Sequence, residues 1–420
     1  MKKNVCYNEA EAEALPRQSA ETVIYKYERT RKIMDLSKYA PASDEQLNKA
    51  LDTAAALVTK NTEEFFNTFP ACSSENNFYG HTWNVDWTTG FWTGEEWLAY
   101  ERTKNPRLKE AALEQVKSFF ARIKYRMETD HHDMGFLYTP SCVAAYKLTG
   151  SEEGKTAAVL AADNLLGRFQ EKGRFFQAWG ELGAPDNYRL IIDCLLNMPL
   201  LFWASDVTGD GKYREKAEEH IKTAMKYIVR PDNSTYHTYY FDPETGEATR
   251  GVTHQGNRDG SAWARGQAWG VYGSAMAYSK LGDPEYADIF RRVTGYFIEH
   301  LPEDLVPYWD FDFTTGSDEP RDSSAGAIAV CGMLEMAKYL EPDEAAYYKD
   351  AARRLIKPLI EKCAVTDASQ SNGLLLHGTY AKKTPTNSCN HCGVDECNTW
   401  GDYFYMEALT RMVKDWEIYW

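Results

Sequence analysis

The sequence predicts an all-α protein, an (α/α)6 barrel of six helical hairpins, with a small β-hairpin in one long loop. Helices with a single apolar stripe alternate along the chain with helices that are apolar or small on every side. A striped helix lies half exposed to water, whereas a helix that is apolar all round is buried. Short polar turns lead from each buried helix to the next striped one, and long aromatic loops lead back. We therefore expect an outer and an inner ring of helices, with the long loops gathered at one end.

The predicted outer helices begin at recognisable start signals. Ser43, Asp44, Glu45 and Gln46 are typical of a capping box, and the helix that they open is expected to run to about residue 66. Lys, Glu and Arg occupy the other faces of these helices, as expected for half-exposed positions. The remaining outer helices are expected to begin near Pro106, Ser151, Gly211, Asp283 and Asp343.

The predicted inner helices are apolar or small almost throughout, as in the run from Ser324 to Val330. Polar turns such as 146–151 and 206–211 follow them, and the glycine in each turn is a stop signal for a helix. The inner segments are about 91–103, 137–149, 191–208, 265–281, 323–340 and 401–413.

The loops that lead from outer to inner helices are long. Several exceed the roughly 2–8 residues usual between helices of a bundle, and such loops are usually functional. They contain most of the histidines, together with tryptophans such as Trp87 and Trp179. Segment 236–250 alternates and turns like a β-hairpin. The loops are about 67–90, 127–136, 171–190, 230–264, 302–322 and 364–400.

No Pro-rich, Gly/Ser-rich or strongly charged linker divides the 420 residues. We therefore predict a single barrel domain over 43–420 with an N-terminal extension over 1–42, in a monomer or weak homo-oligomer. The formal net charge of −15 argues against nucleic acid or an anionic membrane surface as a partner.

The sequence also predicts the cellular compartment of the protein. The first ten residues lack the apolar core of a secretory signal, and segment 191–204 is too short and too polar for a membrane span. The nine cysteines are mostly scattered in apolar helices, so we expect reduced thiols and a cytoplasmic location.

Asp193 stands inside the otherwise apolar segment 190–196, at the start of an inner helix. A carboxylate rarely enters such a place unpaired. Burial raises the pKa of a carboxyl and favours the protonated form that a general acid needs. A structural role, with Asp193 bonded to a neighbouring loop or to Arg189, is an equal alternative.

His131, His132 and Asp133 precede another inner helix. Asp is favoured at a helix start because its charge complements the helix dipole, so a cap is the commoner explanation of Asp133. Arg265 opens a further inner helix. It suits either a bidentate bond to a substrate carboxylate or an ion pair with a protein carboxylate.

Cys389, His391, Cys392 and Cys397 are ligand types for tetrahedral zinc. They lack the second, distant pair that makes a zinc ribbon specific, so we favour a reduced, cysteine-containing loop. A Walker loop, a dinucleotide fingerprint and an HExxH motif are all missing from the sequence. We therefore predict neither a metal nor a cofactor.

Aromatic side chains beside Asn, Gln, Asp and His at one end of a barrel suit a sugar. The apolar face of a pyranose stacks on an aromatic ring, and the polar groups bond its hydroxyls. A single Trp is equally at home in a core, so the cluster rather than any one ring favours sugar binding.

Seven motifs resemble those of the unsaturated glucuronyl hydrolases, which are family 88 glycoside hydrolases, and they span about 83–408. The family resemblance implies the (α/α)6 barrel that the helix pattern predicts independently, and neither a metal nor a cofactor. The motifs occupy residues 84–94, 130–136, 191–197, 236–238, 251–256, 263–270 and 400–403.

The resemblance also implies an activity: removal of a 4,5-unsaturated uronic acid from the non-reducing end of oligosaccharides made by polysaccharide lyases. It implies Asp193 as the general acid/base and Asp133 as the second essential carboxylate. The reaction would hydrate the C4=C5 vinyl ether, so that the glycosidic bond falls apart afterwards. The sugar subsite would be lined by Trp87, His132, His237, Gln255, Arg265 and Trp269.

Other functions fit the same barrel. A conventional inverting glycosidase would cleave a saturated glucuronide, and an unsaturated rhamnogalacturonyl hydrolase would act on a different sugar. A non-catalytic protein that binds acidic sugars would have no need of Asp193 in an apolar helix. Loop 382–397 matches no family motif, so the parent polysaccharide and its sulfation stay open.

Overall fold

The structure is a computed structural model that describes residues 34–420. Leu36–Trp420 form one compact unit. Most of the extension predicted over 1–42 lies outside the described residues. Within the described part of the chain, no helix is long and apolar enough to cross a membrane.

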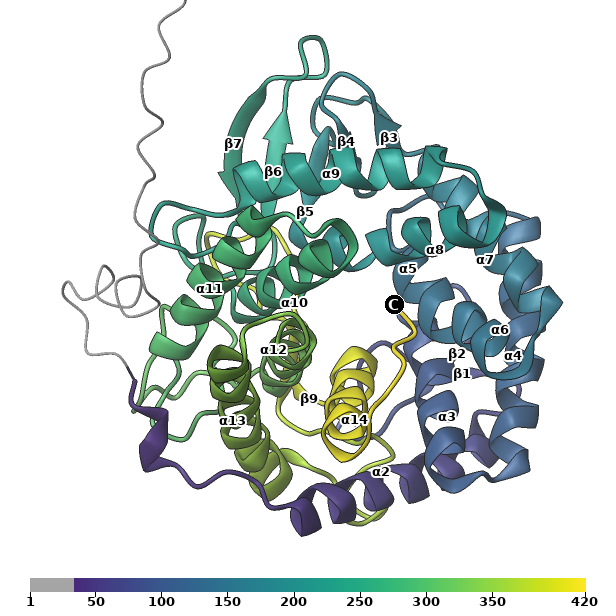
Figure 1. Cartoon of the computed structure of the whole chain (residues 1–420), viewed down its shortest axis with the longest axis vertical. Coiled ribbons are helices and arrows are strands. Elements are labelled where there is room, and N and C mark those ends of the chain that lie inside the picture. Colours follow the sequence, from purple (N-terminus) through teal and green to yellow (C-terminus); the bar gives the residue numbers. More distant parts are fainter. Residues whose placement is uncertain (1–33) are drawn as a thin grey trace, which may run out of the picture. The chain divides into compact units, whose positions relative to one another are not determined.

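Two concentric rings of helices make up this unit, as Figure 1 shows. The predicted (α/α)6 barrel is therefore confirmed. The outer ring consists of α2 (Asp44–Glu64), α4 (Pro106–Lys124), α7 (Glu152–Leu166), α9 (Lys212–Ile228), α11 (Pro284–Glu299) and α13 (Pro342–Pro358). The inner ring consists of α3 (Thr89–Thr103), α5 and α6 (Met134–Tyr138 and Ala144–Thr149), α8 (Met198–Thr208), α10 (Ala264–Leu281), α12 (Ser323–Met336) and α14 (Thr399–Val413).

The local signals explain where these helices begin and which faces they bury. Ser43 caps α2 as predicted: its hydroxyl accepts from the Gln46 amide at 3.2 Å, and the Gln46 side chain accepts from the Ser43 amide at 3.0 Å. Leu47, Leu51 and Val58 form the buried stripe of α2. By contrast, every residue of α12 from Ser323 to Met333 is buried, as an inner helix requires.

Two inner helices are interrupted near the end that carries the long loops. A π-helical turn over Thr139–Val143 separates α5 from α6, and it contains Pro140. Proline has no N–H and clashes with the carbonyl four residues earlier, so a regular helix cannot continue there. A 3₁₀ turn over Ile192–Leu196 precedes α8, which has Pro199 in its first turn. The sequence pattern predicted two continuous helices here, because both segments are uniformly apolar.

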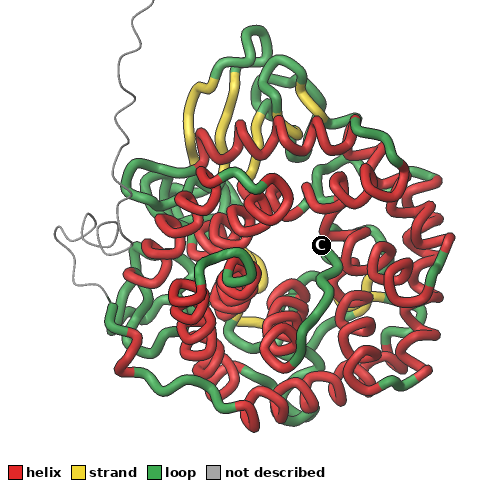
Figure 2. Tube along the Cα trace, in the orientation of Figure 1, coloured by secondary structure: helices red, strands yellow, loops and turns green. Residues whose placement is uncertain are grey.

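Strands occur only in the connecting segments of the described chain (Figure 2). The predicted hairpin is confirmed as β6 (Thr238–Phe241) and β7 (Ala248–Val252). It gains a third strand, β5 (Arg189–Ile191), with Ile191 opposite Thr238. Three further pairs are β1 (Phe69–Pro70) with β2 (His81–Thr82), β3 (Phe169–Gln170) with β4 (Phe175–Phe176), and β8 (Gly378–Ala381) with β9 (Cys392–Glu396).

Aromatic side chains fill the middle of the barrel. The last residues of the chain turn back into the ring (Figure 1), and Trp420 is buried there. Its indole stacks on Phe404 at 5.9 Å between ring centroids, and its N–H donates to Glu407 at 2.7 Å. Phe136 lies 6.3 Å from the same indole and 5.3 Å from Trp269. The barrel is therefore a packed core, and any site must lie at its loop end.

Candidate active site

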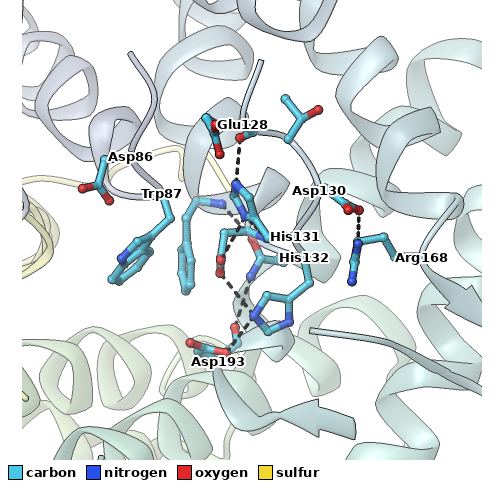
Figure 3. A network of polar contacts seen from close by, with 12 residues as sticks. Asp86, Trp87, Glu128, Asp130, His131, His132, Arg168 and Asp193 are labelled. Atoms are coloured by element: carbon cyan, nitrogen blue, oxygen red, sulfur yellow. Dashed lines mark hydrogen bonds and ion pairs between the residues drawn. The ribbon is translucent and has the colours of Figure 1, made fainter. Parts of the chain in front are cut away.

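Three side chains that are distant in the sequence converge at the loop end of the barrel. His132 and Asp133 come from the loop that follows α4, and Asp193 comes from the 3₁₀ turn before α8. The His132 Nε2 atom lies 3.4 Å from an oxygen of Asp133 and 3.4 Å from an oxygen of Asp193 (Figure 3). One ligand-type atom from each of the three residues lies within 4.8 Å of the other two. Two carboxyl groups and one imidazole thus share a small, largely buried space.

Asp193 owes its position to the break in the inner helix. Strand β5 pairs with β6 up to Ile191, and the 3₁₀ turn then directs the Asp193 side chain toward His132. Burial raises the pKa of the Asp193 carboxyl well above its usual value, and the charge of Asp133 raises it further, although Arg265 opposes both. Burial and the Asp133 charge therefore favour the protonated form of this carboxyl. Arg189, the alternative partner, donates instead to Asp186 and Asn187.

Asp133 occupies the N-cap position of α5, but its side chain makes no capping hydrogen bond. It faces two imidazoles instead. Burial raises the pKa of the Asp133 carboxyl, but His132, His131 and a hydrogen bond from Asn197 outweigh burial and hold the pKa below its usual value. The two carboxyls therefore differ, because their surroundings favour the ionised form of Asp133 and the protonated form of Asp193, which is a typical division between catalytic carboxyl groups.

The two histidines beside Asp133 differ in their contacts. His132 is fully buried, and neither of its ring nitrogens has a hydrogen-bond partner among the described residues. Burial lowers the pKa of His132 to about 4, so its ring is neutral. His131 lies 3.1 Å from an Asp133 oxygen through Nδ1 and 3.1 Å from the Glu128 carbonyl through Nε2. Because a carbonyl only accepts, Nε2 of His131 carries a proton.

His237 and Gln255 form a second polar wall. Gln255 donates through its amide nitrogen to the Tyr380 carbonyl at 2.9 Å, so its amide oxygen faces His237 Nε2 at 3.0 Å. That nitrogen must then carry the proton, and Nδ1 of His237 accepts from Thr238 at 2.7 Å. Burial lowers the pKa of His237 to about 3, so this ring is neutral as well.

Arg265 lies near Asp193, but its guanidinium is already bonded. It donates to Asp322 and to the Thr379 carbonyl through Nη1, and to the Tyr380 carbonyl through Nη2. Both Arg265 and Asp322 are almost completely buried. Of the two roles that the sequence left open, the ion pair with a protein carboxylate is therefore the one that the structure contains. Arg265 anchors β8 through these two carbonyls, and its positive charge lowers the pKa of Asp193.

The three tryptophans near the site lie at different depths. Trp87 is half-buried, stacks on Trp400 at 5.2 Å, and donates its N–H to the Tyr380 hydroxyl at 3.0 Å. Trp269 is 1% exposed and packs against Phe136, in the barrel core. Trp179 is 38% exposed, and its ring lies 6.5 Å from that of His132. Trp179 is thus the more accessible ring, and only its place in a long loop signalled it in the sequence.

A pocket of about 150 Å³ is lined in part by Trp179, whose ring lies 6.5 Å from that of His132. Trp179, Arg189, His254 and Ser388 are among its lining residues. The Arg189 guanidinium stacks over the Trp179 ring at 4.7 Å, and His254 Nδ1 lies 2.8 Å from the Ser388 hydroxyl. Ser388 belongs to the loop that the sequence motifs left unexplained, so this loop reaches the site.

The cysteines of that loop do not converge. Among residues 34–420, His132, Asp133 and Asp193 form the only group of three metal-ligand side chains close enough to share an ion. The thiol of Cys389 faces the Lys382 carbonyl, whereas Cys397 is buried against Ser371. Cys389, His391, Cys392 and Cys397 therefore lack the geometry of the zinc site that the sequence left open.

The sequence matches the model of a known protein family. The model of Glycosyl Hydrolase Family 88 matches residues 57–415, which is most of the chain. The chain belongs to glycosyl hydrolase family 88. It is therefore a glycoside hydrolase.

Individual relatives agree with this family assignment. The chain is 49% identical over 378 residues to the unsaturated chondroitin disaccharide hydrolase of Streptococcus agalactiae serotype III (strain NEM316), which covers 89% of this chain and 93% of that protein. The crystal structure of the unsaturated glucuronyl hydrolase from Streptococcus agalactiae matches with a TM-score of 0.89 and 46% identity, over 93% of this chain and 98% of that one. A mutant of that enzyme complexed with dGlcA-GalNAc6S matches with a TM-score of 0.81 and 43% identity, over the same shares.

This family 88 barrel brings most of the predicted site residues to one end. His132, Asp133 and Asp193 are in mutual contact, and His237 and Gln255 form the adjoining wall. Trp87 lies at the edge of the same region (Figure 3). Arg265 stands one layer behind, and Trp269 lies in the core.

Proposed function

We propose that this family 88 enzyme releases the 4,5-unsaturated uronic acid from the non-reducing end of lyase-generated, glycosaminoglycan-type oligosaccharides. The observation that carries the proposal is the convergence of Asp193, Asp133 and His132 in one buried space, where the surroundings raise the pKa of Asp193 and lower that of Asp133. A carboxyl that holds its proton at neutral pH is suited to protonate a weakly basic carbon atom.

The reaction begins at the vinyl ether of the unsaturated ring. Asp193 donates its proton to C4, and positive charge develops at C5 and the ring oxygen. The Asp193 carboxylate then takes a proton from water as the water oxygen bonds to C5. The hemiketal that forms opens to a C5 ketone and leaves a hemiacetal at C1, whose collapse expels the second sugar. The net change is the addition of one water, and Asp193 recovers its proton.

Asp133 supports this chemistry without forming a bond to the sugar. Its negative charge raises the pKa of Asp193 and so keeps the acid protonated before reaction. The same charge stabilises the cation that develops at C5, in a site from which most water is excluded. His132 adds no charge of its own, because its ring is neutral.

The other residues bind and orient the sugar. His237 and Gln255 are proposed to bond its hydroxyls, and Trp87 its apolar face. The positive charge of Arg265 favours a sugar that bears a carboxylate, although its guanidinium is bonded to Asp322. Trp269 supports the site from the core rather than by stacking on the ring. The pocket lined by Trp179, Arg189 and His254 is proposed to receive the second sugar.

The nature of that second sugar follows from the relatives. The relative that is 49% identical is an unsaturated chondroitin disaccharide hydrolase, and a related structure contains dGlcA-GalNAc6S. We therefore propose chondroitin-type disaccharides as substrates. We also propose a single catalytic domain over 43–420, in a monomer or weak homo-oligomer. The cysteines, which we expect to be reduced thiols, support a cytoplasmic location.

The spacing of the carboxyls argues against the main rival. Inverting glycosidases hold their two carboxyl groups roughly 6.5–9.5 Å apart to leave room for a water molecule. Here, oxygens of Asp133 and Asp193 lie within 4.8 Å of each other. This spacing leaves too little room for an inverting pair, whereas the hydration route needs no carboxylate at the anomeric carbon.

The test is incubation with unsaturated chondroitin disaccharides while the near-ultraviolet absorbance of the conjugated double bond is followed. We expect the absorbance to fall as the second sugar is released, and the saturated glucuronide to be inert. In heavy-oxygen water the label should enter at C5, and in deuterated water one deuterium should enter at C4. Label at C1, or cleavage of the saturated analogue, would replace the hydration route with conventional hydrolysis; binding without turnover would indicate a sugar-binding protein.

A further inference from the structure

A fully buried arginine joins two of the loops that form the site. Arg122 lies in the last turn of α4, and its side chain is among the largest in the core that water does not reach. Its guanidinium donates to six oxygens, none of which belongs to a carboxylate. They are Asn84 Oδ1 (3.0 Å), Val85 O (3.2 Å), Asp86 O (2.7 Å), Thr89 Oγ1 (3.3 Å), Met127 O (3.2 Å) and Glu128 O (2.7 Å).

These oxygens belong to two segments, residues 84–89 before and at the start of α3 and residues 127–128 before α5. The Asp86 carbonyl belongs to the residue just before Trp87, on the loop that leads into α3. The Glu128 carbonyl accepts from Arg122 and also from Nε2 of His131 (Figure 3). With its proton on Nε2, His131 accepts at Nδ1 from the backbone N–H of Asp133 at 3.1 Å. A continuous path of polar contacts therefore runs from Arg122 through Glu128 and His131 to Asp133.

The loop that Arg122 holds has an unfavourable backbone. Arg126 and Glu128 have φ angles of 52° and 45°, in the left-handed region that side chains other than glycine rarely adopt. Such a conformation persists only where surrounding contacts impose it. The carbonyls of Met127 and Glu128, inside this turn, both point to the Arg122 guanidinium.

We propose that Arg122 is a positioning residue for the reaction. Its guanidinium binds the Trp87 loop to the His131–Asp133 loop and fixes the proton of His131 on Nε2 through the Glu128 carbonyl. Nδ1 of His131 is then left to accept from the Asp133 N–H, which sets the position of Asp133 beside His132 and Asp193. The role requires arginine, because a planar guanidinium offers five N–H donors in a fixed fork. A lysine offers three donors from one atom and cannot reach both loops at once.

A second buried arginine provides a matched control. Arg230 follows α9 and donates to the Asp259 carbonyl at 2.9 Å, the Ser261 carbonyl at 2.7 Å and the Ser234 hydroxyl at 3.2 Å. It is a carbonyl-binding guanidinium of the same kind. The loops that it joins, however, carry neither of the two carboxyls. Arg122→Lys disrupts six guanidinium contacts and Arg230→Lys four, but only the first variant acts on Asp133.

The first experiment measures kcat, KM, melting temperature and the pH profile of kcat/KM for both variants. Displacement of a catalytic group by about 1 Å can cost roughly 10²-fold in rate. We expect a loss of this order in kcat for Arg122→Lys, with a smaller change in KM, because the sugar contacts of His237 and Gln255 remain. The acid limb of its profile should move to higher pH, because the Asp133 carboxyl is less well held in its charged form. Arg230→Lys should lower the melting temperature but leave the acid limb of the kcat/KM profile at the same pH as in the wild type.

The second experiment does not depend on turnover, although the role itself rests on the proposed function. Long-range ¹H–¹⁵N spectra report the tautomer of each of the nine histidines, and a His131→Gln sample assigns the signal. We expect the Nε2–H form of His131 in the wild type and in Arg230→Lys, and a mixture in Arg122→Lys. Millimolar guanidinium added to Arg122→Ala should restore part of the lost rate. If wild-type protein left the disaccharide intact, the proposed function would fail, while these spectra would still decide the role of Arg122.

Two results would overturn the inference. One is an Arg122→Lys protein whose pH profile and His131 signal match the wild type, with only the melting temperature lowered. The other is an Arg230→Lys protein that shows the same loss of kcat and the same shift of the acid limb, because general loosening of the loops would then explain both.

Discussion

The pKa values of the neighbouring carboxyl groups of Asp193 and Asp133 are shifted in opposite directions. Asp193 and Asp133 lie within 4.8 Å of each other, and both are largely buried. Two adjacent carboxylates cannot both ionise easily, so the contacts of each decide which one keeps its proton. Two imidazoles and Asn197 lower the pKa of Asp133, whereas burial and the Asp133 charge raise that of Asp193. The chemistry at this scale is therefore an acid beside a fixed negative charge.

Replacement of Asp193 tests the acid directly. Asp193→Asn keeps the size of the side chain but can neither give nor take the proton, so we expect a loss of at least roughly 10²–10⁴-fold in kcat/KM. Asp206→Asn, at the other end of α8 and exposed, is the control and should retain full activity. A folded Asp193→Asn protein within a few-fold of the wild type would remove Asp193 from the mechanism.

The same variant should be at least as stable as the wild type near pH 7. Because the pKa of Asp193 is raised in the folded state, the folded protein binds a proton there that the unfolded chain has released. The stability of the wild type therefore declines as pH rises from the unfolded pKa toward the folded one, and an asparagine has no such penalty. Thermal unfolding of both proteins at pH 4 and pH 7 measures the difference, which should grow with pH. A larger difference at pH 4 would contradict this prediction.

The activity should depend on pH as a bell. It should fall in acid as Asp133 gains a proton and fall in alkali as Asp193 loses one, with both limbs belonging to the coupled pair. His132 should contribute no limb above its pKa of about 4. A profile of kcat/KM from pH 4 to pH 9 checks this, and a flat alkaline side would argue against a protonated acid. Charged or titratable groups that act on the pair are His131, His132, Cys194, Arg122, Arg168 and Arg265.

At the scale of elements, irregular segments position the site. The 3₁₀ turn before α8 carries Asp193, and the short strand β5 anchors that turn to β6. Strand β8 presents the Tyr380 carbonyl, to which Gln255 and Arg265 both donate. Regular helices form the frame, and the breaks and short strands at their ends place the reactive side chains.

The ion pair of Arg265 with Asp322 joins α10 to the start of α12. Asp322→Ala would leave the Arg265 charge buried without its partner, and breaking a buried pair from one side typically costs about 3–5 kcal/mol. We expect the free energy of unfolding to fall by about this amount, which denaturant titration measures. Asp304→Ala removes the carboxylate from the half-exposed pair with Arg321 and should cost much less. Equal losses would mean that burial does not set the strength of the Arg265 pair.

At the scale of the whole molecule, the proposed chemistry contains no step on a metal. Among the described residues Cys389, His391, Cys392 and Cys397 do not converge, and the proposed mechanism uses His132, Asp133 and Asp193 for proton transfer and charge stabilisation. We therefore expect chelation to leave turnover and melting temperature unchanged. Elemental analysis of protein purified without added metal is the independent check, and stoichiometric zinc would overturn this expectation.

Much of the barrel could be predicted from the sequence, because helix periodicity, caps and stops are properties of neighbouring residues. The Ser43 capping box, the buried run from Ser323 to Met333 and the hairpin of β6 and β7 were all predicted in this way and are confirmed. The interruptions at Pro140 and before Pro199 escaped the prediction, because an apolar run looks the same whether its backbone is regular or broken.

The helix pattern alone predicted the class of this protein, because alternating striped and buried helices require a double ring, and the apolar segment 190–196 singled out Asp193 as a candidate. Only the tertiary structure decided which groups meet. It gave Arg265 the partner Asp322, assigned Trp269 to the core, exposed Trp179, and brought Arg122 between two loops. The physical reason is that these contacts join residues far apart in the chain, and their free energy depends on burial and geometry that no local pattern records.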